Sequence, residues 1–275
     1  MQGLPEFIPT ATKIAYLQLL LAVGFGVLDF GSFVSPKAIP QLRDTAEVLA
    51  GLDLSRTKTK LLAIVANQRG AEQAANYAEI SYLGFPLSVS ETFQRRNTNQ
   101  TIAEARADVA AMHALCERRG KTLVVYLSMG FGNPYGDPWS PALVAEFTAE
   151  LAALGIRIVA LSDTVGVSTP ALITPLFAEL IPAFPAIEFG AHLHTTPTTW
   201  HEKVQAAYQA GCRRFDSAVG GIGGCPMATD TLTGNMATEN LVAFLAAQNE
   251  DLGLHASEFE KALLMSQAVF GPAHC

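Results

Sequence analysis

The chain has 275 residues, of which 49% are hydrophobic and 16% are charged. This composition supplies a large buried core and therefore excludes an intrinsically disordered protein. The 18 basic and 25 acidic side chains give a net charge of −7. Because no basic stripe offsets this acidity, we expect no nucleic-acid partner.

The longest uncharged stretch near the N-terminus, residues 14–28, is shorter than the about 20 residues of a membrane-spanning helix. We therefore expect no membrane partner. The cysteines, Cys116, Cys212, Cys225 and Cys275, form no CxxC pair. That spacing is typical of reduced thiols in a cytoplasmic enzyme rather than of a secreted disulfide framework.

Short apolar or β-branched runs alternate along the chain with longer helical patterns. The expected strands cover residues 27–34, 60–66, 80–90, 122–128, 157–162, 187–194 and 212–217. The expected helices cover residues 12–23, 42–52, 71–77, 103–119, 141–154, 170–181, 198–210, 238–248 and 258–267. Strands that alternate with helices of this length predict βαβ units and a parallel sheet.

The seven expected strands are one short of an eight-stranded (β/α)8 TIM barrel. The missing strand would be the first, because the chain opens with turn-like residues 2–5 and then a helix. No linker or low-complexity segment divides the chain. The sequence therefore predicts a single α/β domain over residues 1–275: a TIM barrel that lacks its first strand and carries extra C-terminal helices.

Polar side chains stand at the carboxyl ends of the expected strands, which is where parallel barrels build their active sites. They are Asp29, Ser32, Asn67, Ser90, Glu91, Tyr126, Ser128, Asp163, His192, His194 and Ser217. The recurrence of such residues at seven strand ends predicts a functional site at that face of the barrel.

His192-Leu193-His194 is the sharpest local signal in the sequence. Side chains two apart on a strand point to the same side. Two convergent imidazoles suit a divalent metal ion. The alternative is a pair of histidines that make separate hydrogen bonds.

Asp163 and Cys225 each admit two interpretations, and Asn235 has a local structural one. Asp163 follows a strand as an active-site carboxylate or as part of an Asx-turn or helix cap. Cys225 stands in a glycine-rich loop as an acid/base thiol or as an incidental residue. Asn235 lies just before an expected helix, where asparagine most often caps the helix.

The motifs follow one another in a defined order along the chain: SFVSPK at 32–37, SETF at 90–93, SDTVG at 162–166, HLH at 192–194, GGCP at 223–226 and GNMATE at 234–239. This series resembles the 3-hydroxy-3-methylglutaryl-CoA lyase family of DRE-TIM metallolyases. The resemblance covers essentially the whole chain, and its SFVSPK and GGCP segments are the most specific.

The resemblance implies a set of site residues. The metal ligands for Mg²⁺ or Mn²⁺ would be His192, His194 and Asn235. The catalytic residues would be Cys225, on a loop that closes over the substrate, Asp163 and His192. The residues expected to contact the substrate are Gln2, Asp29, Ser32 and Tyr126.

The implied reaction is a retro-Claisen cleavage of 3-hydroxy-3-methylglutaryl-CoA to acetyl-CoA and acetoacetate, so the expected partner is an acyl-CoA. The metal would act as a Lewis acid and template. Asp163 or His192 would be the general base, and Cys225 would supply a proton to the departing enolate. The last helices, between residues 238 and 267, could cover the barrel or form a homodimer contact.

The chain departs from the family pattern in three places. The family's first strand ends in Arg-Asp-Gly-(Leu/Met)-Gln, with a catalytic Arg and a metal-binding Asp, whereas this chain begins at Met1-Gln2. Asp29 stands where the family usually has Glu, and Thr195-Thr196-Pro197 where it has Asp-Thr-Tyr. Because losing one oxyanion donor costs about 3–4 kcal/mol, we expect the 275-residue chain to be nearly inactive and an upstream-extended chain to be active.

Two alternative functions fit the same sequence. One is a related aldolase or acyl-CoA condensing enzyme, although the GGCP cysteine favours the lyase. The other is a non-catalytic barrel homologue. Acyl-CoA binding has no clear motif: Arg95, Arg96 and Asn97 would meet the phosphates of the nucleotide or form a solvated charged loop.

Overall fold

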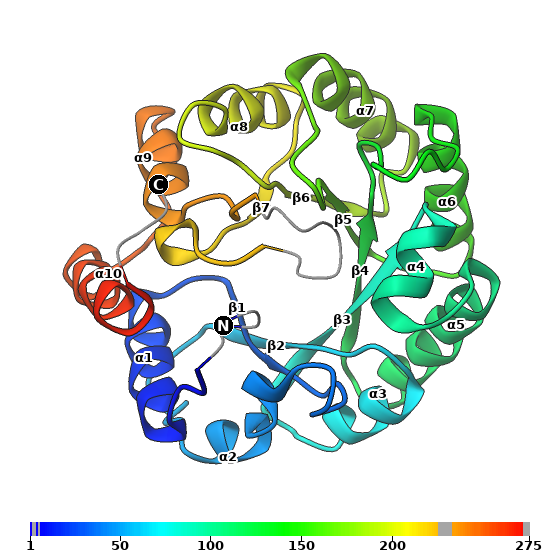
Figure 1. Ribbon diagram of the computed structural model, residues 1–275. Helices are drawn as coiled ribbons and strands as arrows, with labels where there is room; N and C mark the ends of the chain where they lie inside the picture. Colours follow the sequence, from blue (N-terminus) through cyan, green and yellow to red (C-terminus); the bar gives the residue numbers. More distant parts are fainter. Residues whose placement is uncertain (2–3, 5, 225–232, 272–275) are drawn as a thin grey trace.

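The computed structural model describes residues 1, 4, 6–224 and 233–271. Its sheet has seven parallel strands that are hydrogen-bonded in chain order. They are β1 (Val27–Ser32), β2 (Lys60–Ile64), β3 (Ile80–Ser88), β4 (Thr122–Ser128), β5 (Ile158–Ser162), β6 (Glu188–His192) and β7 (Arg214–Asp216). The sheet curls around a central space with the helices outside it (Figure 1), which confirms the predicted barrel fold.

The edges of the sheet are β1 and β7, which are not hydrogen-bonded to each other in the described part of the chain. Residues 1, 4 and 6–9 form no strand ahead of the first helix. Both features agree with the prediction of a barrel without its first strand. In Figure 1 the N-terminus lies inside the ring of strands, beside β1.

Helices cover the outer face of the sheet. They are α1 (Thr10–Val23), α2 (Thr45–Ala50), α3 (Gln68–Ala75), α4 (Glu91–Thr98), α5 (Ile102–Arg118), α6 (Pro141–Ala153), α7 (Pro170–Ala183), α8 (Trp200–Gln209), α9 (Thr238–Ala247) and α10 (Ala256–Phe270), with 3-10 turns at Pro40–Leu42 and Val219–Gly221. The C-terminal helix α10 packs beside α1 (Figure 1). The rings of Tyr16 and Phe270 meet edge to face there, with centroids 5.3 Å apart.

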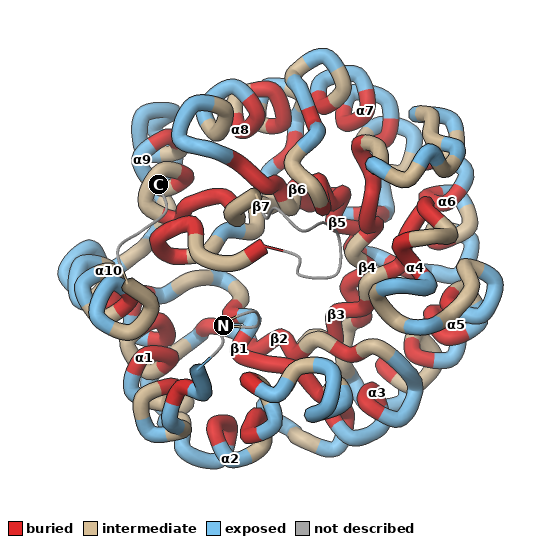
Figure 2. The backbone as a smooth tube through the Cα atoms, viewed as in Figure 1, coloured by how far each residue is buried: buried red, intermediate tan, exposed pale blue. Residues whose placement is uncertain are grey.

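Both faces of the sheet are apolar, as expected when helices cover a parallel sheet. Outward side chains and the inner helix faces form the main core, so the strands are largely buried and the outer helix surfaces exposed (Figure 2). Inward side chains form a second, smaller cluster around Leu62, Val124 and Ile158. This inner cluster lines part of the barrel interior, and most of the strands end in a polar residue.

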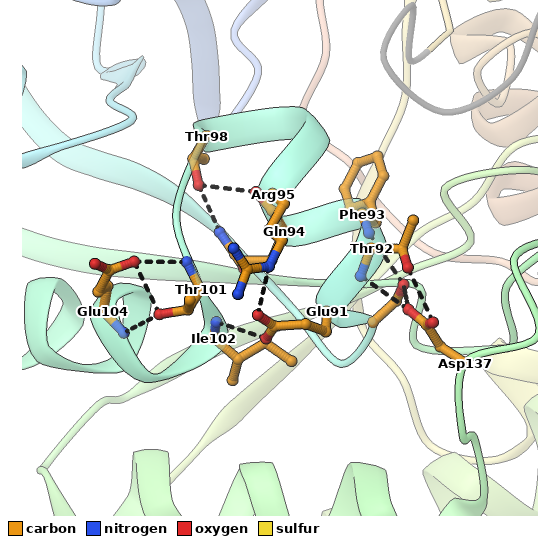
Figure 3. A network of polar contacts seen from close by, with 11 residues as sticks. Glu91, Thr92, Phe93, Gln94, Arg95, Thr98, Thr101, Ile102, Glu104 and Asp137 are labelled. Atoms are coloured by element: carbon orange, nitrogen blue, oxygen red, sulfur yellow. Dashed lines mark hydrogen bonds and ion pairs between the residues drawn. The ribbon is translucent and has the colours of Figure 1, made fainter.

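The structure corrects the prediction between residues 80 and 103. The strand ends at Ser88, and Arg95, Arg96 and Asn97 belong to helix α4 rather than to a charged loop. The Ser90 hydroxyl accepts a hydrogen bond from the backbone N–H of Phe93. Asp137 accepts hydrogen bonds from the backbone N–H and the hydroxyl of Thr92 (Figure 3). Because α4 is polar and its second capping residue comes from a distant loop, hydrophobic periodicity could not reveal it.

A buried ion pair ties α1 to the segment ahead of α2. Lys13 and Asp44 are 2% and 6% exposed, and Nζ lies 2.6 Å from Oδ1. Lys13 also donates to the carbonyl of Gln41, and the Thr10 hydroxyl donates to Asp44. Removing one partner of such a pair costs about 3–5 kcal/mol of folding free energy, because the other charge stays buried without compensation.

Among the described residues, no helix combines the length and the apolar character that a membrane crossing requires. The thiols of Cys116 and Cys212 are free and buried.

Candidate active site

The two histidines of the HLH motif lie at the carboxyl end of β6. His192 is the last residue of the strand, and the rings of His192 and His194 have centroids 5.7 Å apart. In the sheet register His192 stands beside Asp216 of β7. Its Nδ1 lies 3.2 Å from Asp216 Oδ2. The structure thus pairs His192 with the carboxylate of Asp216. This residue was not among those predicted at the strand ends, where the neighbouring Ser217 was named instead.

Asn235 reaches the same place from a distant part of the chain. The backbone N–H of Thr195 donates to the carbonyl of Gly234 at 2.9 Å, and that of Met236 donates to the carbonyl of Leu193 at 3.0 Å. These bonds place Asn235 antiparallel to His194. The Asn235 side chain also hydrogen-bonds the His194 ring. Two imidazoles and one carboxamide are therefore brought together.

Asn235 is not a helix cap, since the N-cap of α9 is Ala237. Its Nδ2 donates to the carbonyl of Ile222 at 2.9 Å. This hydrogen bond uses the nitrogen end of the carboxamide. The oxygen end, which is the part of the group that ligates metals, remains on the side of His194.

His194 is held as a neutral ring. It is 3% exposed, and burial, followed by the charges of His192 and Lys203, lowers the pKa of His194 to about 3. The backbone of Thr164 hydrogen-bonds the ring in a way that favours its protonated form, so the ring N–H donates to the carbonyl. A neutral imidazole with one nitrogen fixed by a carbonyl is the form in which histidine binds metals.

The residues present fit a divalent cation. The His192–Asp216 contact is the carboxylate–histidine arrangement that orients metal-binding imidazoles. Nitrogen and carbonyl-oxygen donors together suit a divalent metal ion. No three His, Cys, Asp or Glu side chains within the described ranges are grouped to hold a metal, so such a site depends on the carboxamide of Asn235.

Asp163 is buried at the end of β5, with both carboxylate oxygens engaged. Oδ1 accepts from the backbone N–H of Ser168 at 2.9 Å. Oδ2 accepts from the Ser168 hydroxyl and, at 2.8 Å, from Lys203 Nζ. The N-cap of α7 is Thr169, so Asp163 does not cap that helix. These partners hold both oxygens of Asp163 and favour a structural role for it over that of a base.

Asp29 faces the interior of the barrel. In the sheet register it stands beside Leu62, a residue of the inner cluster. Asp29 is exposed to solvent by its accessible surface, although many protein atoms lie around its carboxyl group. This burial raises the pKa of Asp29 to about 7, against the opposing effects of the Met1 amine, the Gly31 N–H and His192. The carboxyl group thus titrates near neutral pH.

Tyr126 and Ser32 also lie on the inward side of their strands. The Tyr126 ring meets the His192 ring edge to face at 5.5 Å, and burial raises the pKa of Tyr126 well above 10. Ser32, in register with Ile64, is buried, and its hydroxyl has no hydrogen-bond partner among the described residues. The two other predicted site residues, Gln2 and Cys225, lie outside the described residues.

These features define a parallel α/β-barrel enzyme whose polar residues gather at the carboxyl ends of the strands. The family model described as HMGL-like matches residues 1–265. The chain therefore belongs to the HMGL-like family, which confirms the resemblance drawn from the motifs.

Proteins of known sequence and structure agree with this assignment. A hydroxymethylglutaryl-CoA lyase of Bacillus subtilis (strain 168) is 34% identical over 245 residues, which cover 89% of this chain and 81% of the relative. A (R)-citramalyl-CoA lyase of Chloroflexus aurantiacus is 32% identical over 251 residues, covering 88% and 78%.

A solved HMG-CoA lyase from Acinetobacter baumannii, in complex with coenzyme A and 3-methylmalate, superposes with a TM-score of 0.92. It is 29% identical to this chain, and the match covers 100% of this chain and 89% of that structure.

Proposed function

We propose that this protein is a metal-dependent hydroxymethylglutaryl-CoA lyase, which cleaves 3-hydroxy-3-methylglutaryl-CoA to acetyl-CoA and acetoacetate. The observation that carries the proposal is the convergence of His192, His194 and Asn235 at the mouth of the barrel. The match of the family model to residues 1–265 supports one lyase domain over the whole chain.

His192, His194 and Asn235 would hold Mg²⁺ or Mn²⁺. When bound, the cation supplies Lewis-acid polarisation of substrate oxygens and a template for their orientation. The chain prepares the ligands for this role. Asp216 holds Nδ1 of His192, which leaves the other ring nitrogen for the cation, and the Thr164 carbonyl holds one nitrogen of His194.

Cleavage requires a base that removes the proton of the tertiary hydroxyl group. We assign this role to Asp29 rather than to the predicted Asp163 or His192. Both carboxylate oxygens of Asp163 accept hydrogen bonds from Ser168 or Lys203, and His192 is proposed as a metal ligand. The pKa of Asp29, raised to about 7 by burial, suits a general base at neutral pH.

Tyr126, neutral because burial raises its pKa, would orient the substrate as a hydrogen-bond donor, and Ser32 would do the same with its free hydroxyl. Cys225 remains the proposed acid for the departing enolate, and Gln2 a proposed substrate contact. The acyl-CoA substrate is supported by the relative solved with coenzyme A. Cytoplasmic location and a homodimer stay predictions.

The experiment is a product assay with purified protein. The 275-residue chain, and a chain extended at its N-terminus by a strand ending in Arg-Asp-Gly, are incubated with 3-hydroxy-3-methylglutaryl-CoA and Mg²⁺, Mn²⁺ or EDTA. We expect metal-dependent release of acetoacetate, faster from the extended chain. Citramalyl-CoA is tested in parallel, because one relative is a (R)-citramalyl-CoA lyase.

The proposal fails if neither chain releases acetoacetate above the EDTA control. Faster cleavage of citramalyl-CoA would move the assignment to that substrate. Formation of product from acetyl-CoA and a 2-oxo acid would instead indicate a condensing enzyme.

Replacing Asp216 with asparagine tests whether the carboxylate of Asp216 orients the His192 ring for metal binding. We expect Asp216→Asn to weaken Mn²⁺ binding about 10- to 100-fold, as is typical when the outer partner of a metal-binding histidine is lost. Mn²⁺ affinity is measured from the free-ion signal in electron paramagnetic resonance. Glu188→Gln, at the opposite end of β6 and 56% exposed, is the matched control and should leave the affinity unchanged.

A further inference from the structure

Lys203 of α8 is a fully buried lysine with three partners. It is 2% exposed, and its Nζ donates to Asp163 Oδ2 at 2.8 Å, to the carbonyl of Gly166 at 3.0 Å and to the carbonyl of His194 at 2.9 Å. An ammonium group has three N–H donors, so every donor is used. Because lysine is almost never fully buried unless it is paired, these three contacts are what stabilise Lys203 in its buried position.

The partners of Lys203 join the ends of two neighbouring strands. Asp163 follows β5, and its backbone N–H donates to the carbonyl of His192 at 2.9 Å. His194 follows β6, and its carbonyl accepts from Lys203 directly. The Lys203–Asp163 pair, 3% and 0% exposed at its side chains, therefore fixes the backbone on both sides of the HLH motif.

The same pair fixes the turn that orients the His194 ring. The turn runs from Asp163 to Gly166, closed by a hydrogen bond from the Gly166 N–H to the Asp163 carbonyl at 3.0 Å. Lys203 holds both ends of this turn. Thr164, within it, accepts the ring hydrogen bond of His194. Its hydroxyl also accepts from the backbone N–H of Met129 at 2.8 Å.

We propose that Lys203 and Asp163 form a positioning pair for the metal ligand His194. The pair sets the His194 backbone through its carbonyl and sets the ring through the Thr164 turn. The His194 ring thereby lies between the backbone of Thr164 and the side chain of Asn235, beside which the cation would lie. This inference rests on the proposed function, since it needs a metal at this place.

The test is Mn²⁺ affinity in Lys203→Met, measured by electron paramagnetic resonance together with the unfolding temperature. We expect the affinity to fall about 10- to 100-fold, the range seen when support of a metal-binding histidine is removed. The matched control is Lys13→Met, which breaks a second buried lysine–aspartate pair, Lys13–Asp44. The control should lower the unfolding temperature and leave Mn²⁺ affinity unchanged.

A double variant, Lys203→Met with Asp163→Leu, separates positioning from stability. It leaves no unpaired buried charge and should recover much of the lost stability, while Mn²⁺ binding stays weak. If Lys203→Met alone does not fold, Mn²⁺ affinity is measured in the double variant instead. Wild-type Mn²⁺ affinity in either variant would overturn the inference. A wild-type chain that binds no Mn²⁺ would instead count against the proposed function.

Discussion

Replacing His194 with alanine is expected to lower the rate of acetoacetate release by about 10³-fold or more. Metal polarisation of a substrate oxygen contributes several kcal/mol, and each 1.36 kcal/mol corresponds to a tenfold change in rate. His194 is central to the site because its ring contacts both Thr164 and Asn235 and lies 5.7 Å from that of His192.

The loss is measured as kcat of the N-terminally extended chain at saturating Mn²⁺, beside the Mn²⁺ affinity. His113→Ala provides the matched control, since His113 lies on α5, outside the ring of strands. Its Nε2 lies 3.9 Å from Oε1 of Glu117 on the same helix. The control should retain both quantities. If His194→Ala keeps near-wild-type affinity and rate, the imidazole is not a ligand.

Replacing Asp29 with asparagine in the N-terminally extended chain is expected to lower kcat about 10²- to 10⁴-fold, the usual contribution of a general base. In the wild type, activity should fall as the pH drops below the pKa of Asp29, because the protonated carboxyl cannot accept a proton. That pKa is raised to about 7 by burial, and a bound cation would bring it lower. The limb of the pH profile should therefore lie at or below pH 7.

The acid limb should disappear in Asp29→Asn and return in Asp29→Glu, which keeps the carboxylate. A pH profile that is unchanged in Asp29→Asn would remove Asp29 from the reaction.

Stability in the metal-free protein gives an independent check on Asp29. Its folded-state pKa of about 7 lies above the ordinary value of 3.8, so stability declines as the pH rises from about 4 to 7. Asn mimics the protonated form. Because water reaches the side chain, we expect Asp29→Asn to be more stable than the wild type by only about 1–2 kcal/mol at pH 8, and equal to it near pH 3.

Much of the fold could be predicted from local patterns. The strands β2 to β5 are mostly apolar because both faces of the sheet are covered, and all seven strands formed within a few residues of their expected bounds. Helix α4 was missed because it is polar and shows no hydrophobic periodicity, and because Asp137, which also binds its first turn, lies 45 residues beyond Thr92. Its N-cap Ser90 was a local signal, but the expected strand 80–90 included that residue.

The predicted ligands were chosen from motif and strand position, and the structure brings them together. Their supporting residues were missed for a physical reason: Asp216 and Lys203 act through partners 24 and 40 residues away. Lys203 did carry a signal, since it shares the buried face of α8 with Ala206 and Ala207. A lysine on an apolar helix face indicates a buried partner.

The most direct measurement is anomalous diffraction from a crystal of the protein grown with Mn²⁺. The account predicts one Mn²⁺ at the mouth of the barrel, bound by ring nitrogens of His192 and His194 and by the carboxamide oxygen of Asn235. A crystal in which Mn²⁺ binds elsewhere, or in which these three side chains surround no ion at saturating Mn²⁺, would contradict it.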